Sequence, residues 1–361
     1  MKITQILLLP FSMVFLLFIK LRLWFYQRGF WGKVNFSVPI ISIGNIQAGG
    51  TGKTPLVEYL CDMLSKDYGV GVLSRGYKRL TYGFRYVQIT DDYKKVGDEM
   101  FWLKRLHPEL SIGVAENRVE GIPNLMSYSM NTELIILDDG YQQLGIRNQL
   151  NILLTPYHKP FSKDYLIPMG RLREPKSESR RADILIITKC PPNRLHQKDE
   201  IVKELDLSIL NNQKVFLSAL SYPAPYLMFY EGLIKRFFPT ENILLVTGIA
   251  DAEPLKNYLS PLVNSITHLS YPDHYRYRNT DVAYIAKKYH ALKKQKDKVF
   301  LITTEKDAVR LLSYRNLMQE LTIEFYVQPA NLIFDDPVGF QKEIYKVLPD
   351  KSENDKPINQ G

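Results

Sequence analysis

The stretch Ile40-Ile-Ser-Ile-Gly44-Asn-Ile-Gln-Ala-Gly49-Gly50-Thr51-Gly52-Lys53-Thr54-Pro55 decides the fold. Its apolar start predicts a buried strand, its glycines a tight turn, and the apolar spacing after Pro55 a helix. A strand, a glycine-rich turn and a helix N-terminus direct backbone N–H groups toward phosphate oxygens. We therefore expect a nucleotide-binding loop, rather than a merely structural turn, made of Gly49, Gly50, Thr51, Gly52, Lys53 and Thr54.

In such a loop the lysine contacts the β- and γ-phosphates and the following hydroxyl holds Mg²⁺. Lys53 and Thr54 stand at these two positions, so we expect ATP as substrate and Mg²⁺ as metal. The match to G-x-x-x-x-G-K-[ST] is imperfect, because the pattern places its first glycine at Gln47 and the chain has it at Gly44. The strand before the turn and the helix after it support the prediction.

Two carboxylates follow a second apolar run, Leu134-Ile-Ile-Leu-Asp138-Asp139. Ligands of parallel α/β sheets bind at the carboxyl ends of the strands. One of Asp138 and Asp139 is therefore expected to complete the Mg²⁺ shell. The alternative is an acidic turn without a role in binding.

Short apolar runs alternate with amphipathic stretches after Pro39. This alternation predicts βαβ units, that is, an α/β fold with a P-loop NTPase-type, mostly parallel sheet flanked by helices. We expect an N-terminal membrane segment at 1–35, a kinase core at 36–210, a smaller C-terminal α/β unit at 211–350 and a polar tail at 351–361. The expected strands are 39–43, 69–73, 133–137, 151–154, 183–188, 214–220, 242–247, 298–303 and 321–327.

The chain has 361 residues and a net charge of +9, and six of the surplus positive charges precede its first acidic residue, Glu58. Five of these charges flank the apolar run 6–19, and the sixth is Lys53 of the glycine-rich loop. The 14 residues of the run cover about 21 Å as a helix, short of the roughly 30 Å hydrocarbon core. Positive charges concentrated near the N-terminus, beside an apolar run, indicate contact with an anionic membrane surface. We therefore expect no nucleic-acid partner.

We expect an uncleaved helix in contact with the membrane. A buried core helix and a signal peptide are the alternatives, and the second lacks the small residues of a cleavage site. The two cysteines are too few for a disulfide framework or a metal cluster, which favours a reducing, cytoplasmic location.

Two further polar clusters suggest phosphoryl transfer to an acceptor. Asp98 and Glu99 open an expected helix, and His274 follows an expected strand. A carboxylate tuned by a histidine can accept a hydroxyl proton, although such groups also cap helices or stabilise the fold. A GTPase is disfavoured, because Thr188-Lys189-Cys190-Pro191 lacks the aspartate that would bind guanine.

Ten motifs follow one another along the chain: Gly44-Asn45 with Gly49–Pro55, Ser74-Arg75-Gly76-Tyr77, Gly97-Asp98-Glu99, Glu116-Asn117-Arg118, Asp138–Gln142, Gly170–Pro175, Thr188-Lys189, Gly248-Ile249-Ala250, Pro272-Asp273-His274 and Thr304-Glu305-Lys306-Asp307. Together, over roughly residues 1–345, they resemble the tetraacyldisaccharide 4'-kinases, the lipid A 4'-kinases of Gram-negative bacteria. Tyr275 departs from the pattern, since a second histidine is frequent at that position.

The resemblance implies transfer of the ATP γ-phosphate to the 4'-hydroxyl of an anionic acylated disaccharide lipid. It places the protein at the cytoplasmic face of the bacterial inner membrane, with no obligate protein partner. Asp98 resembles the catalytic base, His274 its partner and Glu99 a support for metal or base. Candidates for binding the sugar or phosphate are Arg75, Tyr77, Asn117, Arg118 and Arg171. The alternative is a membrane-associated regulatory P-loop ATPase or GTPase acting on a protein.

Overall fold

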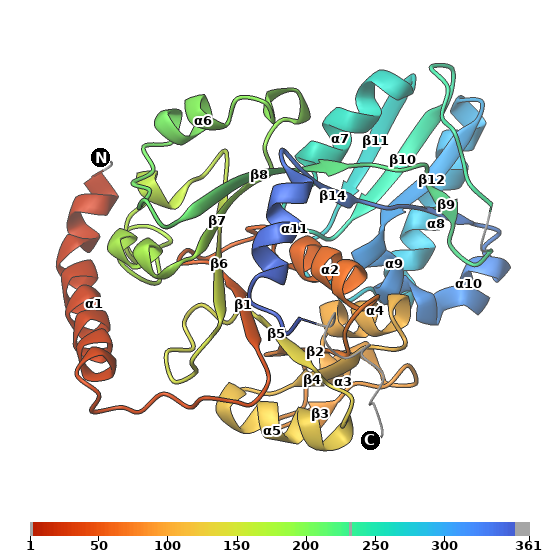
Figure 1. Cartoon of the computed structure of the whole chain (residues 1–361). Coiled ribbons are helices and arrows are strands. Elements are labelled where there is room, and N and C mark those ends of the chain that lie inside the picture. Colours follow the sequence, from red (N-terminus) through yellow and green to blue (C-terminus); the bar gives the residue numbers. More distant parts are fainter. Residues whose placement is uncertain (1–2, 231–232, 351–361) are drawn as a thin grey trace.

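The computed structural model describes residues 3–230 and 233–350. They form two α/β units, each a mostly parallel sheet with helices on both faces (Figure 1). The expected α/β class, with a mostly parallel sheet flanked by helices, is confirmed. The tail 351–361 lies outside the described residues.

The first sheet has the strand order β14-β8-β7-β6-β1-β5-β2-β4-β3. Neighbouring strands are parallel except at the two edges, where β3 and β14 run antiparallel to their neighbours. Ile43 of β1 is in register with Asp138 of β5, so the glycine-rich loop and the acidic pair leave the sheet side by side. The strands are β1 (Ile40–Gly44), β2 (Val70–Ser74), β3 (Arg85–Tyr86), β4 (Ser111–Val114), β5 (Leu134–Asp138), β6 (Leu150–Pro156), β7 (Ile184–Thr188), β8 (Lys214–Ser221) and β14 (Asn331–Phe334).

Helices cover both faces of this sheet. Leu56, Leu60 and Leu64 recur every four residues on one side of α2 and are fully buried, which docks α2 on the sheet. The helices α2 (Lys53–Leu64), α4 (Asp98–Leu106) and α11 (Pro337–Tyr345) share one core, and α5 (Arg118–Tyr128) and α6 (Lys198–Glu204) pack on the opposite face. The short α3 (Tyr93–Val96) precedes α4.

The second sheet has the order β11-β10-β12-β13-β9, in which only β9 is antiparallel. Its strands are β9 (Tyr226–Leu227), β10 (Asn242–Thr247), β11 (Ser265–Ser270), β12 (Val299–Thr304) and β13 (Phe325–Gln328). Its helices are α7 (Glu253–Leu259) on one face, and α8 (Asn279–Gln295), α9 (Glu305–Leu311) and α10 (Arg315–Glu320) toward the other. Short 3₁₀-helices lie at Phe161–Lys163, Lys176–Arg181, Pro192–Arg194, Ser260–Leu262 and Leu312–Tyr314.

The chain leaves the first unit after β8 and returns to it at β14, so the two units are joined by two crossings. Strands β8 and β14 and helix α11 come from the range 211–350 but complete the first unit. The division of the chain at residue 210 stays a prediction. Val309 of α9 packs into the core of the first unit, which brings this helix of the second unit against α4.

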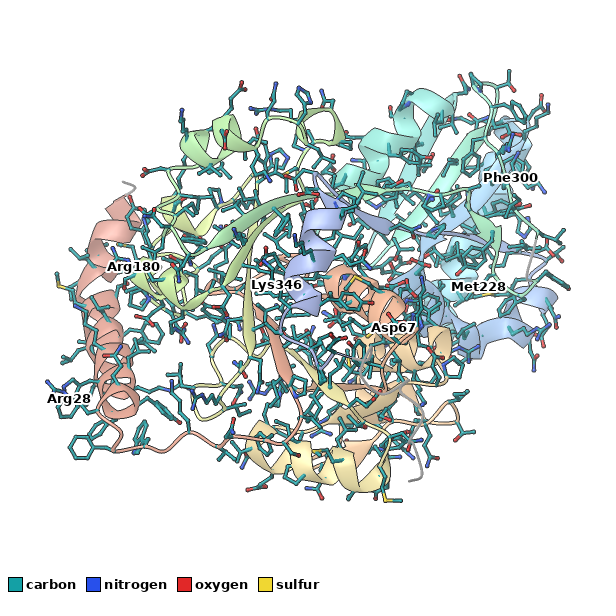
Figure 2. The ribbon with its side chains drawn as sticks, in the orientation of Figure 1. Arg28, Asp67, Arg180, Met228, Phe300 and Lys346 are labelled. Carbon is teal, nitrogen blue, oxygen red and sulfur yellow. The ribbon has the colours of Figure 1, made fainter. Side chains whose placement is uncertain are left out.

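Helix α1 (Ile3–Gln27) lies along the outer side of the first unit, away from the second sheet (Figure 1). Arg28, just after α1, and Phe300, on β12, mark opposite sides of the molecule (Figure 2). One face of α1 contacts the body of the protein. Ser12 Oγ donates to the carbonyl of Leu166 at 3.2 Å, and Arg22 donates to the carbonyl of Gln142 at 2.8 Å.

The opposite face of α1 is apolar and exposed. It carries Leu7, Phe11, Met13, Val14, Leu17, Phe18, Leu21 and Trp24. Residues Leu7–Gln27 are long and apolar enough to cross a membrane by length and composition, with a mean hydropathy of 1.9. At 25 residues α1 is about 37 Å long, longer than the uncharged run alone suggests.

Candidate active site

The glycine-rich loop links β1 to α2 and is fixed by side chains from neighbouring strands. Gly49 and Gly52 have φ of +115° and +89°, values that side chains disfavour, so glycine is required at both positions. Thr188 Oγ1, at the end of β7, donates to the carbonyl of Thr51 at 2.7 Å. Asn45 Nδ2 donates to Thr51 Oγ1 at 3.0 Å. The loop therefore keeps its shape through the protein's own contacts.

Lys53 begins α2 and points at the acidic end of β5. Its Nζ lies 3.3 Å from Asp139 Oδ1, and Arg173 lies 3.3 Å from Asp139 Oδ2. Burial opposes ionisation of Asp139, but the charges of Lys53 and Arg173 outweigh it and lower the pKa of this carboxyl. Arg173 is a site residue that the sequence analysis did not select, although it lies within the Gly170–Pro175 motif.

Asp138 is buried behind this pair and accepts a hydrogen bond from Ser74 Oγ at 2.8 Å. Burial, together with the nearby negative charge of Glu99, raises the pKa of Asp138 to about 6. A cation near these carboxyls would favour the ionised form of Asp138. Asp138 and Asp139 thus differ in surroundings, the first facing another acid and the second facing cations.

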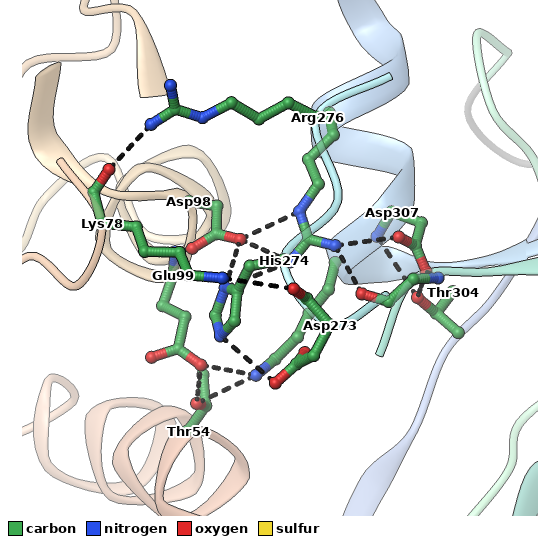
Figure 3. Close-up of polar contacts among 12 residues, drawn as sticks. Thr54, Lys78, Asp98, Glu99, Asp273, His274, Arg276, Thr304 and Asp307 are labelled. Atoms are coloured by element: carbon green, nitrogen blue, oxygen red, sulfur yellow. Dashed lines mark hydrogen bonds and ion pairs between the residues drawn. The ribbon is translucent and has the colours of Figure 1, made fainter. Parts of the chain in front are cut away.

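Thr54 and Glu99 meet directly, as Figure 3 shows. Thr54 Oγ1 donates to Glu99 Oε1 at 2.7 Å. Lys306, from α9 of the second unit, donates to the same Glu99 oxygen at 2.6 Å and to Thr54 Oγ1 at 3.2 Å. Burial opposes ionisation of Glu99, yet the charge of Lys306 keeps the pKa of this carboxyl below its usual value. A cation of the second unit therefore lies at the hydroxyl expected to hold metal.

Asp98 and His274 come together across the two units. His274 Nδ1 lies 3.0 Å from Asp98 Oδ2, and Arg310 Nε donates to the same oxygen at 2.9 Å. Burial alone would raise the pKa of Asp98, but the hydrogen bond from His274 and the charge of Arg310 hold it well below its usual range. Asp98 and His274 open into a cleft lined by Tyr77, Lys78, Tyr93, Lys94, Gly97, Arg276 and Arg310.

The expected substrate-binding residues have different surroundings. Tyr77 is exposed and its ring centroid lies 5.2 Å from that of His274, and Arg75 is exposed after β2. Asn117 caps α5 by accepting from the backbone N–H of Val119 at 3.1 Å. Arg171 pairs with Asp164 at 2.8 Å.

Arg118 is placed differently from the expectation that it binds substrate. Its side chain is buried and donates to the carbonyls of Ala115 at 2.6 Å and Asp138 at 3.2 Å. A guanidinium committed to buried backbone carbonyls is not offered to a ligand. Arg118 instead supports the end of β5, from which Asp138 and Asp139 project.

Within residues 3–230 and 233–350, no group of three or more His, Cys, Asp and Glu side chains is arranged to hold a metal ion. A nucleotide-bound Mg²⁺ needs fewer protein ligands, because phosphates and water supply the others. Thr54 and Glu99 are in contact, and the acidic pair of Glu99 and Asp138 favours a cation. The residues present therefore fit a magnesium ion bound together with nucleotide.

The family model described as Tetraacyldisaccharide-1-P 4'-kinase matches residues 4–349. The chain belongs to this family. A tetraacyldisaccharide 4'-kinase of Phocaeicola vulgatus is 36% identical over 332 residues, covering 91% of this chain and 90% of the relative. One from Bacteroides fragilis is 37% identical over 322 residues, covering 84% and 82%. A crystal structure of LpxK from Aquifex aeolicus in complex with ATP matches with a TM-score of 0.74 and 28% identity, over 96% of this chain and 100% of that chain.

In this tetraacyldisaccharide 4'-kinase family member, sequence reasoning missed two cations of α9, Lys306 and Arg310. Lys306 lies within the Thr304–Asp307 motif, so a signal for it was present without a role attached. Arg310 lies outside every quoted motif. Its partner Asp98 is 212 positions away in the chain, and only the fold brings the two together.

Proposed function

We propose that the chain transfers the γ-phosphate of ATP to the 4'-hydroxyl of a tetraacylated disaccharide 1-phosphate in lipid A biosynthesis. Family membership over nearly the whole chain carries this proposal. The site supports it, because Asp98 and His274 border a cleft, and Glu99, next to Asp98, accepts a hydrogen bond from Thr54 of the nucleotide loop. A regulatory ATPase or GTPase acting on a protein partner is not favoured.

In this proposal Asp98 is the base that accepts the proton of the 4'-hydroxyl. A carboxylate whose pKa lies below its usual range is a weak base, so its main task is to orient the hydroxyl. This agrees with phosphoryl transfer through a loose transition state, in which positioning and charge stabilisation outweigh proton removal. His274 holds Asp98 from the side of the second unit.

Lys53 contacts the β- and γ-phosphates in this proposal, exchanging its contact with Asp139 for one with the nucleotide. Thr54, Glu99 and the pair Asp138 and Asp139 would hold Mg²⁺, which neutralises phosphate charge when it is bound. Arg75, Tyr77 and Arg171 remain proposed contacts for the sugar and its phosphate, since planar guanidinium groups suit phosphate. Asn117 also remains a proposed contact for the sugar or its phosphate, and its side chain caps the N-terminus of α5.

The test is a lipid-phosphorylation assay with purified protein, γ-labelled ATP and a defined tetraacyldisaccharide 1-phosphate. We expect the label in a chloroform-soluble glycolipid, at rates that depend on both substrates. Omission of the disaccharide is the control. Label that appears only as free phosphate, whether or not the disaccharide is present, would contradict the kinase function and favour the regulatory ATPase.

We propose further that α1 attaches the chain to the cytoplasmic face of the inner membrane by its exposed apolar face. Burying each large side chain contributes about 1.5–3 kcal/mol, and each nearby cation about 1 kcal/mol at an anionic surface. Lys20 and Arg28 are the cations available near the apolar face. Because Ser12 and Arg22 contact the body of the protein, we favour a helix lying in the interface.

Removing residues 1–26 is expected to move the protein from the membrane fraction to the soluble fraction. The triple variant Leu17→Ser, Phe18→Ser and Leu21→Ser should weaken vesicle binding while keeping the Ser12 and Arg22 contacts. Val338→Ser, at an exposed apolar residue of α11, is the matched control and should bind as wild type does. Sedimentation with vesicles at low and high salt measures both; a truncated protein that still sediments under both conditions would show that another surface binds.

A further inference from the structure

Helix α9 of the second unit places Arg310 against Asp98 of the first. The Arg310 side chain is 1% exposed, and that of Asp98 is 11% exposed. The proposed function assigns no task to Arg310, which lies outside the residues that contact nucleotide, metal or sugar in it. Its contacts nevertheless include the carboxylate proposed as the base.

One terminal nitrogen of the Arg310 guanidinium, Nη1, is held by two acceptors of the second unit. Nη1 donates to Asp307 Oδ1 at 2.9 Å and to the carbonyl of Gly248 at 2.8 Å. Asp307 is itself completely buried and accepts from Gly248 N at 2.9 Å and from Thr304 Oγ1 at 2.8 Å. These contacts fix the plane of the guanidinium. Figure 3 shows Asp98, His274, Thr304 and Asp307 within the same network of polar contacts.

The remaining nitrogens of Arg310 engage one oxygen of Asp98. Nε donates to Oδ2 at 2.9 Å, and Nη2 contacts the same atom. His274 Nδ1 also lies against Oδ2, at 3.0 Å. Oδ1, by contrast, accepts only the backbone N–H of Glu99, at 3.1 Å, among the contacts of the described chain. Two nitrogens of Arg310 and one of His274 therefore contact Oδ2 of Asp98. Oδ1 keeps a lone pair that can accept a hydrogen bond from the substrate hydroxyl.

We infer that Arg310 is a positioning residue for phosphoryl transfer, which turns the Asp98 carboxylate so that Oδ1 faces the acceptor hydroxyl. The inference rests on the proposed function of Asp98. Because Arg310 and Asp98 belong to different units, the carboxylate is oriented only when the two units are in contact. A misplaced base lowers the turnover of bound substrates rather than their binding.

The first test compares Arg310→Lys with wild type in the lipid-phosphorylation assay. Lysine keeps the charge but cannot reproduce the two-sided guanidinium contacts. We expect kcat to fall at least about tenfold, while the KM values for ATP and disaccharide change less than about twofold. Arg315→Lys, at an exposed arginine of α10, is the matched control and should keep the wild-type kcat. A wild-type kcat in Arg310→Lys would overturn the inference.

The second test asks whether Arg310 acts on turnover through Asp98. In an Asp98→Ala background, Arg310→Lys should lower kcat no further, because a residue that acts through Asp98 has nothing left to orient. A further tenfold loss in this background would overturn the inference. If Arg310→Lys does not fold, Asp307→Asn takes its place, with an expected three- to tenfold loss of kcat that again vanishes in the Asp98→Ala background.

The same assay distinguishes failure of this inference from failure of the proposed function. If the wild-type protein labels no glycolipid, the kinase function itself is wrong. If wild type is active and Arg310→Lys has the same kcat, only the role of Arg310 is wrong. Thermal unfolding of each variant, measured alongside, shows whether a loss of turnover accompanies a loss of the fold.

Discussion

Asp98→Ala is expected to lower kcat by about three orders of magnitude, while the dissociation constant for ATP changes little. The side chain borders the cleft, and its partners His274 and Arg310 hold one of its oxygens. Removing it deprives the acceptor hydroxyl of its orienting group and proton acceptor. The glycine-rich loop is untouched, since its shape depends on Thr188 and Asn45.

Glycolipid labelling measures kcat, and equilibrium titration with a fluorescent ATP analogue measures nucleotide binding. The matched control is Asp297→Ala, because Asp297 is exposed after α8 and is not among the residues that line the cleft. It should behave as wild type in both measurements. An Asp98→Ala protein that turns over within tenfold of wild type would exclude Asp98 as the base.

The second large effect is expected from Lys53→Met, which should reduce kcat/KM for ATP by about two to three orders of magnitude. Lys53 is the cation at the start of α2 and lies 3.3 Å from Asp139. Methionine fills a similar volume but cannot neutralise phosphate charge. Because Asp139 keeps Arg173 as a partner, we expect the fold to survive.

Steady-state kinetics at varied ATP tests this expectation, and circular dichroism checks the fold. Lys66→Met is the matched control, since Lys66 is an exposed lysine just after the same helix. It should leave kcat/KM unchanged. Equal effects of the two substitutions, or a Lys53→Met enzyme with normal kcat/KM, would mean that Lys53 does not contact the phosphates.

The sequence predicted the central strands of the two sheets better than the strands at or next to the sheet edges. A strand forms within each of the nine expected ranges, although the one expected at 321–327 begins only at Phe325. Continuous runs of Val, Ile and Leu are typical of strands buried on both faces of a parallel sheet. The strands for which it gave no residue range are β3, β4, β9, β11 and β14. Most are short, and β11 (Ser265–Ser270) has only two apolar residues among Ser, Thr and His at a sheet edge, so hydrophobic periodicity gives little signal there.

The sequence predicted those parts of the candidate site that lie at the carboxyl ends of strands. The register of β1 with β5 places the glycine-rich loop beside Asp138, and this follows from adjacent parallel strands. The side-chain direction of Arg118 was not predictable, because a motif names a residue without saying whether it faces the cleft or the backbone behind it. Its burial against the carbonyls of Ala115 and Asp138 is a packing outcome.

The sequence by itself determined the nucleotide loop, the acidic pair after β5, the apolar N-terminal helix and the family. Each is local, depending on residue types at fixed spacing within one segment. Only the tertiary structure decided that α9 delivers Lys306 to Glu99 and Arg310 to Asp98, across separations of 207 and 212 residues. The physical reason is that a charge pair between two units depends on how their cores dock. The packing of α9 against α4, with Val309 buried in the first core, is part of that docking, and no local pattern encodes it.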